Sequence, residues 1–219
     1  MALVDLWFEG GYHPFAEQAV WFGDLIEELG HTPRRKDRRT IFADSEDRPD
    51  LLVVGALYWS GLGETYQPLS DSEWAYLKSH MAEGRPLLAN HCVIGSFDER
   101  PELYEVWDGL WIWGESRHSP VQEFDVRVLA GSHPTVDGIS DFRIEDELYY
   151  NLKNPSRSKV VMEAEYEGGR WPLAWVRGGE VADDPARVVF SGLGHDMGSL
   201  ASPSLRQFLQ NSVRWLLQD

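Results

Sequence analysis

The chain has 219 residues, 42% of them hydrophobic and 26% charged, a balance typical of a folded globular domain. Its 36 acidic and 20 basic residues give a net charge of -16, which argues against nucleic acid or an anionic membrane as a partner. No apolar run approaches the roughly 18–20 residues that a membrane span needs. The amino terminus lacks the positive segment of a secretory signal, and the single cysteine excludes an internal disulfide framework. We therefore expect one cytoplasmic domain over residues 1–219, and the sequence leaves open whether it forms a homo-oligomer.

The first ninety residues alternate short apolar runs with helical patterns. Residues 3–8, 50–57 and 86–91 have the length and composition of buried strands. Apolar residues at three- and four-residue steps predict a helix over residues 15–29, with Gly30 as its stop. Short strands that alternate with helices predict an α/β fold with a doubly wound, mostly parallel sheet.

A second helix is predicted by a capping box. Ser70 and Glu73 are spaced so that each side chain can bond the other residue's backbone amide. The apolar pattern that follows continues to Gly84. A third helix is predicted at the end of the chain, where Ser202 stands before a proline at the first helical position.

The second half of the chain changes to strands that no helical pattern separates. Residues 123–128, 159–167, 170–176 and 187–193 read as strands, several of them joined by turns that contain glycine. We therefore expect extra β strands in the C-terminal half, added to the parallel sheet.

The run Arg34–Arg39 is the strong cluster of positive charge in this acidic chain. It would suit an anion or a nucleic acid, but no aromatic residues stand among its charges. We interpret it as a solvated connection between the first helix and the next strand.

Two of the expected strands end in a histidine. Asn90-His91 closes the third strand, and Gly194-His195-Asp196 follows the last one. Ligands of open parallel sheets bind at the carboxyl ends of the strands, and histidine titrates near neutral pH. His91, His195 and Asp196 are therefore the candidate catalytic residues, and we expect both histidines to lie outside the core. The alternative for each histidine is a local hydrogen bond without a role in a site.

Four other residues are candidates for binding a substrate. Glu147 and Tyr149 are two positions apart and would share one face of a strand, where a carboxylate beside a phenol suits sugar hydroxyls. His118 stands in an expected loop that could overhang the site, and Trp59 stands in another, where an indole face can stack on a sugar. The alternatives are a structural pair for Glu147 and Tyr149 and a core position for the tryptophan.

A metal site is a minority alternative. His91, His118, His195 and Asp196 are residue types that bind zinc. No two of them have the spacing of ligands on one helix, so only proximity in the fold could join them. We expect no metal or cofactor, with a zinc-type ion at His91 and His195 as the exception.

Four segments together resemble the trehalose-utilisation (ThuA-like) family, which belongs to the class I glutamine-amidotransferase-like superfamily. They are residues 84–91, 132–139, 146–149 and 193–196, in this order along the chain. The resemblance implies a flavodoxin-like sheet and a connection to trehalose or another disaccharide. It makes a small-molecule sugar the expected partner.

The resemblance also bears on the type of chemistry. Beside the amidotransferases, His91 and not Cys92 falls at the nucleophile position, and His195 falls where their triad histidine lies. The family's glycine-rich approach is replaced here by residues 85–90. An imidazole does not supply the thiolate that forms a thioester, so glutaminase activity is disfavoured. We interpret Cys92 as a small buried apolar residue.

Two functions remain open at this point. The first is a carbohydrate-catabolism protein that binds or transforms a sugar, such as a keto-sugar or a disaccharide, by histidine-centred acid/base chemistry. The second is a non-catalytic amidotransferase-like domain used for ligand binding or assembly. A pocket that brings His91 and His195 within hydrogen-bond or one-water reach would favour the first, and a pocket filled with tryptophan would favour the second.

Overall fold

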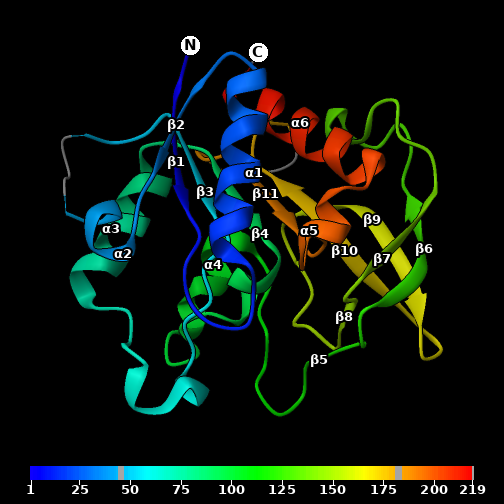
Figure 1. Cartoon of the computed structure of the whole chain (residues 1–219), viewed down its shortest axis with the longest axis horizontal. Coiled ribbons are helices and arrows are strands. Elements are labelled where there is room, and N and C mark those ends of the chain that lie inside the picture. The colour runs from blue at the N-terminus through cyan, green and yellow to red at the C-terminus, as the bar shows by residue number, and fades with distance from the viewer. Residues whose placement is uncertain (44–46, 181–183, 219) are drawn as a thin grey trace.

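A computed structural model describes residues 1–43, 47–180 and 184–218 of the chain. Strands form a central sheet and helices lie on both of its faces (Figure 1). In chain order the elements are β1 (Leu3–Trp7), α1 (Phe15–Glu28), β2 (Thr32–Arg35), α2 (Arg38–Ile41), β3 (Leu51–Val54), α3 (Asp71–Ala82), β4 (Leu87–Asn90), α4 (Tyr104–Trp107), β5 (Arg117–His118), β6 (Gln122–Val128), β7 (Phe142–Asp146), β8 (Tyr149–Tyr150), β9 (Lys159–Tyr166), β10 (Gly169–Arg177), β11 (Val188–Ser191), α5 (Met197–Leu200) and α6 (Pro203–Leu217).

The sheet joins a parallel half to an antiparallel half. Its strand order is β2-β1-β3-β4-β11-β10-β9-β6-β7. The pairs from β2 to β11 are parallel, and those from β11 to β7 are antiparallel. The parallel half has the flavodoxin-like order, so the predicted fold class is confirmed, including the extra strands of the C-terminal half. A separate small sheet pairs β5 with β8.

Helices cover both faces of the parallel strands, which is why these strands are apolar on both sides. Helices α1 and α6 pack on one face, in front of the sheet in Figure 1, and α3 and α4 pack on the other. In β3, Val53 faces the first layer, and Leu52 and Val54 face the second. None of the helices in the described residues is long and apolar enough to cross a membrane.

Three of the predicted helix ends are confirmed. The Ser70 hydroxyl accepts from the Glu73 amide, and the Glu73 carboxylate accepts from the Ser70 amide at 2.7 Å, which closes the capping box of α3. Ser202 caps α6 through the amide of Leu205. Gly30 has φ +83° just after α1, a left-handed conformation that glycine adopts without strain.

The interpretation of the Arg34–Arg39 run as a solvated connection was wrong. Its first residues form β2, the edge strand beside β1. The Arg34 Nε donates to Asp5 Oδ1 at 2.6 Å, and Asp5 is buried. The Arg38 Nε donates to Glu73 Oε1 at 2.7 Å. These arginines therefore tie β2 and α2 to β1 and α3, a role that the charge pattern alone did not indicate.

Candidate functional site

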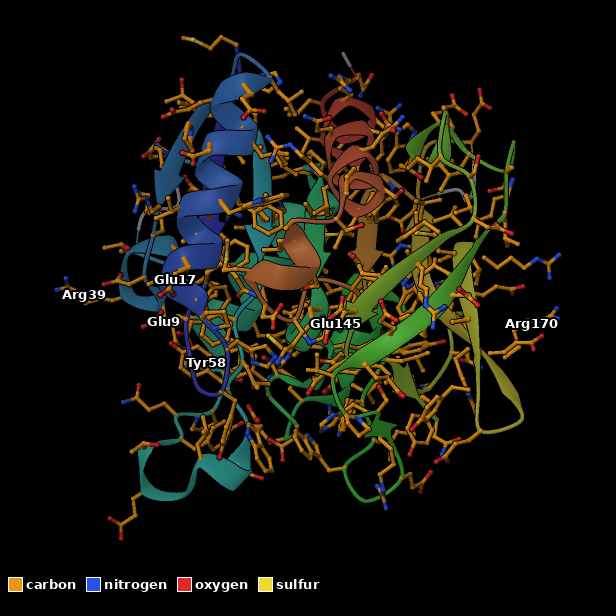
Figure 2. The ribbon with its side chains drawn as sticks, turned by 45° about the vertical axis from the view of Figure 1, so that its right-hand side comes forward. Glu9, Glu17, Arg39, Tyr58, Glu145 and Arg170 are labelled. Carbon is orange, nitrogen blue, oxygen red and sulfur yellow. The ribbon has the colours of Figure 1, made fainter. Side chains whose placement is uncertain are left out.

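The loops after β1, β3, β4 and β11 meet at one edge of the sheet around a cavity of about 430 Å³, here called the histidine cavity. Figure 2 shows Glu9 and Tyr58, from the loops after β1 and β3, side by side near the start of α1. Arg170 of β10 lies on the far side of the molecule. The polar residues that line the cavity are His13, His118, Glu147 and His195, and its aromatic walls are Tyr12, Trp59, Trp111, Trp113 and Tyr149.

His91 forms the turn after β4 and lies beneath this cavity. Its φ is +46°, so the chain leaves the strand sharply in the left-handed region. The His91 Nδ1 lies 2.8 Å from the Gly192 carbonyl oxygen, and its Nε2 lies 2.7 Å from the Tyr149 hydroxyl. A carbonyl only accepts, so Nδ1 carries the proton and Nε2 accepts from Tyr149.

The expectation that His91 lies outside the core was wrong, because its side chain is fully buried. The loop after β11 and Tyr149 of β8 close over it, and neither contact can be read from the end of a strand. His195 is partly exposed, as a residue at the rim of a site is.

Cys92, the next residue, is buried as predicted. Its thiol donates to the Gly55 carbonyl oxygen at 3.0 Å. Burial raises the pKa of this thiol far above its ordinary value, so the thiolate is absent at neutral pH. The turn after β4 therefore presents an imidazole where a cysteine-dependent enzyme presents its nucleophile.

Asp146, at the end of β7, fixes the loop that carries His195. Its carboxylate accepts from the Gly194 amide at 2.7 Å and from the His195 amide at 3.1 Å. Gln18 of α1 donates to the carbonyl oxygens of the same two residues at 3.0 Å each. The backbone of His195 is therefore held from both sides, which orients its ring toward Glu147.

Glu147 is the centre of the cluster. Its Oε1 lies 3.1 Å from His118 Nδ1, and its Oε2 lies 3.1 Å from His195 Nδ1 and 3.6 Å from His91 Nε2. Burial raises the pKa of this carboxyl, but the imidazoles around it outweigh burial and hold the pKa far below its ordinary value. Glu147 is thus ionised at neutral pH.

Two of these imidazoles favour the protonated form. The hydrogen bond and charge of Glu147 raise the pKa of His118, whose side chain is half exposed. For His195, burial lowers the pKa, but the nearby Glu147 outweighs burial and the net shift is upward. Imidazolium groups beside a carboxylate can exchange protons near neutral pH, while the carboxylate itself stays ionised.

His13 completes the cluster and was missed in the sequence. Its ring lies 4.8 Å from that of His195 and 5.2 Å from that of His91, measured between centroids. Burial lowers the pKa of His13 to about 3, so this imidazole is neutral. It stands in the loop after β1, six residues beyond the end of that strand, so the rule that selected histidines directly at strand ends did not find it.

Asp196 does not join the cluster. Its carboxylate accepts from the Ser199 amide at 3.0 Å and forms the capping box of α5. The Asp196 carboxylate, which the sequence predicted to be catalytic, therefore caps a helix instead of joining the cluster. The structure does bring together the other candidates, which are His91, His195, Glu147, Tyr149, His118 and Trp59.

Tryptophans form a wall of the cavity without filling it. Trp59 stacks on Trp113 with 3.9 Å between ring centroids, and Trp111 lies 5.5 Å from Trp113. The indole N–H groups of Trp59 and Trp111 are buried and have no hydrogen-bond partner within the described parts of the chain. Flat apolar faces beside the imidazoles of the cavity suit a ligand with both C–H and hydroxyl groups.

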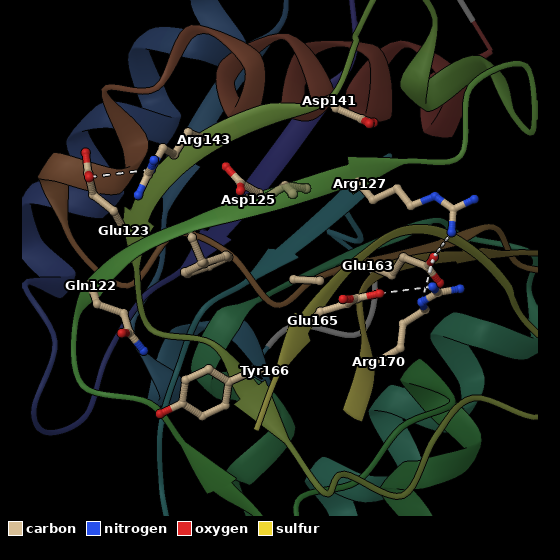
Figure 3. Close-up of a pocket in the computed structure, with 13 residues that line it drawn as sticks. Gln122, Glu123, Asp125, Arg127, Asp141, Arg143, Glu163, Glu165, Tyr166 and Arg170 are labelled. Atoms are coloured by element: carbon tan, nitrogen blue, oxygen red, sulfur yellow. Dashed lines mark hydrogen bonds and ion pairs between the residues drawn. The ribbon is translucent and has the colours of Figure 1, made fainter. Parts of the chain in front are cut away.

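A second hollow, of about 470 Å³, lies over β6, β7, β9 and β10 and is here called the charged trough (Figure 3). Six of its eight charged residues pair with one another, as the dashed lines of Figure 3 show. The distances are 2.9 Å for Arg127–Glu163, 3.1 Å for Arg170–Glu165 and 3.4 Å for Arg143–Glu123. The trough holds no histidine or cysteine among its lining residues, so we place the candidate site in the histidine cavity.

Comparison with solved structures first defines the class of the fold. A glutamine amidotransferase from Thermotoga maritima superposes with a TM-score of 0.54 at 12% identity, covering 99% of this chain and 98% of that one. The chain therefore has the class I glutamine-amidotransferase-like fold, and at this identity the likeness shows the fold alone.

The family follows from a closer match. The family model "ThuA: Trehalose utilisation" matches residues 7–216, and the chain belongs to this family. The resemblance seen in the sequence is thus confirmed, and the family indicates a role in carbohydrate utilisation. A ThuA-like protein from Parabacteroides merdae ATCC 43184 superposes with a TM-score of 0.77 at 16% identity, over 99% of this chain and 90% of that one.

Another ThuA-like protein, from Bacteroides uniformis ATCC 8492, gives a TM-score of 0.74 at 13% identity over 98% of this chain and 90% of that one. No curated protein matches the chain. The function therefore has to be argued from the histidine cavity itself.

Proposed function

We propose that the chain binds a sugar in the histidine cavity and transfers protons on it as part of carbohydrate utilisation. The observation that carries this proposal is the Glu147 carboxylate, which contacts three imidazoles at the base of an aromatic-walled cavity. The chain's membership of a trehalose-utilisation family also supports a sugar as the substrate class.

The walls suit a sugar better than a planar or fully apolar ligand. The stacked pair of Trp59 and Trp113 offers an indole face to the C–H face of a pyranose ring. The imidazoles that line the cavity can bond to hydroxyl groups. A volume of about 430 Å³ accommodates one or two sugar rings.

The cluster favours proton transfer beside a carbonyl over hydrolysis by paired carboxylates. Glycosidases of the common type place two carboxyl groups on either side of the scissile bond. Among the described residues that line the cavity, Glu147 is the one carboxylate. We therefore assign a keto-sugar, with a C–H bond acidified by the neighbouring carbonyl, as the substrate class.

The protonation states supply both partners for such a transfer. Burial keeps His13 neutral, so it is the imidazole of the cluster that can accept the proton removed from carbon. His118 is biased toward the imidazolium form, is half exposed, and is the candidate acid that protonates the carbonyl oxygen. Glu147 holds the charge of His118 and keeps it oriented.

Glutamine hydrolysis is disfavoured by the same geometry. The buried thiol of Cys92 faces Gly55, and the residue in the turn after β4 is His91. Neither group supplies the thiolate that attacks an amide carbonyl.

The test is exchange of carbon-bound hydrogen. The protein is incubated in D₂O with a ketohexose or a keto-disaccharide, and loss of the proton beside the carbonyl is followed by NMR. We expect exchange with the wild-type protein and a loss of about 100-fold or more in Glu147→Gln. The matched control is Glu163→Gln in the charged trough, which should exchange at the wild-type rate.

Binding without exchange would support the second function, a non-catalytic sugar-binding domain. Tryptophan fluorescence detects that binding, because Trp59, Trp111 and Trp113 all line the cavity. The absence of both binding and exchange with every keto-sugar and disaccharide would contradict the proposed function.

A further inference from the structure

Four residues from separate loops place one ligand atom each within a small volume. They are His13, His91, Glu147 and His195, and these atoms lie within 4.8 Å of one another. Ligands of a tetrahedral zinc ion at its usual bond lengths stand about 3.4 Å apart. Glu147 Oε2 already lies 3.1 Å from His195 Nδ1 and 3.6 Å from His91 Nε2, so part of the tetrahedron is in place.

Two of the histidines present an unprotonated nitrogen to this volume. The His91 Nδ1 donates to the Gly192 carbonyl oxygen, so Nε2 is unprotonated; it accepts from the Tyr149 hydroxyl and lies 3.6 Å from Glu147 Oε2. The His13 Nδ1 lies 3.3 Å from the Gly11 carbonyl oxygen, and its buried Nε2 has no partner in the described chain. Metal-binding histidines are commonly held in this way, one nitrogen on a backbone carbonyl and the other on the ion.

The other two groups are also held from outside. His118 bonds Oε1 of Glu147, so Oε2 is the oxygen directed at the cluster. The His195 Nδ1 is close to Glu147 Oε2 but lacks the alignment of a hydrogen bond. Asp146 and Gln18 hold the His195 backbone. The supporting contacts thus fix the four groups while their inward atoms remain without a well-aligned partner, apart from the Tyr149 hydroxyl on His91.

We propose that His13, His91, His195 and Glu147 bind one divalent transition-metal ion, with zinc favoured by the donor set. Three imidazoles and a carboxylate are borderline ligands that suit Zn²⁺ better than Mg²⁺ or Ca²⁺, which prefer oxygen. Cys92 is not a ligand, since its sulfur faces Gly55. The ligand set differs from the one that the sequence indicated, with His13 and Glu147 in the places of His118 and Asp196.

The site opens into the cavity, so a sugar oxygen can approach the ion. With an ion bound, His13 and His195 are ligands, so the proton removal proposed for His13 belongs to the metal-free chain, and His118 is the imidazole of the cluster left to exchange protons. Tyr149 then releases the Nε2 of His91 and becomes a free hydroxyl at the cavity wall. The inference rests on the ligand geometry alone. It does not depend on which sugar the cavity binds, or on whether it binds one.

Metal content and affinity test the proposal directly. The purified chain is stripped with a chelator, and Zn²⁺ binding is measured by isothermal titration calorimetry, with bound zinc counted by mass spectrometry. We expect one ion per chain, and Co²⁺ in its place should give the visible absorption of a tetrahedral site. His13→Ala and Glu147→Gln should each lower Zn²⁺ affinity by about 100-fold or more, since even an outer contact costs 10–100-fold.

The control is His31→Gln, which removes one histidine at the opposite end of β1, where its ring lies beside Ala2. It should bind one ion with wild-type affinity. Wild-type affinity in His13→Ala and Glu147→Gln, or the absence of a stoichiometric ion in the wild type, would overturn the proposal.

Sugar binding, measured on both the stripped and the zinc-loaded protein, separates the two proposals. Stoichiometric zinc without sugar binding supports the metal site and contradicts the proposed function. Sugar binding without stoichiometric zinc supports the proposed function and contradicts the metal site.

Discussion

The charged trough and the histidine cavity have similar volumes, about 470 and 430 Å³, but their polar groups are arranged in opposite ways. In the trough, acids and bases alternate across neighbouring strands and pair with one another. In the cavity, imidazoles from separate loops converge on Glu147 alone. Exposed pairs each contribute little free energy, and the paired groups are already engaged with one another. Convergence from several strand ends is therefore the better indicator of a site than the number of charges.

The two regions also differ in how they are built. The trough follows from the two-residue period of antiparallel strands, which places every second side chain of β6 on the exposed face. The cavity depends on the parallel strand order, which brings the loops after β1, β4 and β11 together. A change in the trough should consequently affect one surface pair, and a change in the cavity should affect several contacts at once.

The largest expected effect follows from replacing His91. The His91→Ala variant leaves a void in a fully buried position and removes the partners of the Gly192 carbonyl and the Tyr149 hydroxyl. We expect a loss of about 3 kcal/mol in the free energy of unfolding, measured with urea. Arg127→Ala in the trough should change it by less than about 0.5 kcal/mol. A loss in His91→Ala as small as that of Arg127→Ala would contradict the structural role given to this histidine.

A smaller effect is expected for the aromatic wall. Trp59→Ala removes one ring of the stacked pair and should weaken sugar binding about tenfold, or about 1.4 kcal/mol. Tyr166→Ala, which removes an aromatic ring from the trough, should leave the affinity unchanged. Equal losses of sugar affinity in both variants would show that the sugar does not bind specifically in the histidine cavity.

The fold was largely predictable because its signals are local. The helix period over residues 15–29, the Ser70–Glu73 capping box and the apolar runs of the parallel strands each depend on a few neighbouring residues. Strand β2 was missed because Thr32–Arg35 is a polar edge strand that pairs on one side only. Its strand character comes from pairing with β1, which sequence periodicity does not contain.

The site was predictable only in part, for the same reason. His91 and His195 stand directly at strand ends, and Glu147 and Tyr149 were selected as a pair. The convergence of His13 on them depends on the neighbouring positions of β1, β3 and β4 in the sheet. Asp196 shows the opposite error, since a carboxylate three residues before Ser199 is also the signature of a capping box.

A pH experiment separates burial from function among the histidines. His80 of α3 is fully buried, bonds the Pro86 carbonyl oxygen through Nε2 at 3.1 Å, and lies outside the cavity. Burial lowers its pKa to about 4. Between pH 6.5 and 4 the unfolded chain therefore binds a proton that the folded chain does not, and stability falls as the pH falls.

In His80→Gln this contribution is absent. We expect the slope of unfolding free energy against pH in that interval to be smaller in the variant, by up to about 1.4 kcal/mol per pH unit. Urea unfolding at several pH values measures both slopes. Sugar and zinc affinity should not change, and parallel slopes in the two proteins would show that His80 is protonated in the fold.

The smallest expected effect concerns Cys92, a buried thiol that lines the histidine cavity. Cys92→Ser retains a donor to the Gly55 carbonyl oxygen, and neither proton transfer nor the metal ligands involve the sulfur. The variant should therefore keep the wild-type rate of hydrogen exchange on a keto-sugar. Iodoacetamide should modify native Cys92 slowly at pH 7, because burial raises the pKa of the thiol. Rapid modification together with loss of glutamine hydrolysis would instead assign the chemistry to a cysteine of the amidotransferase type.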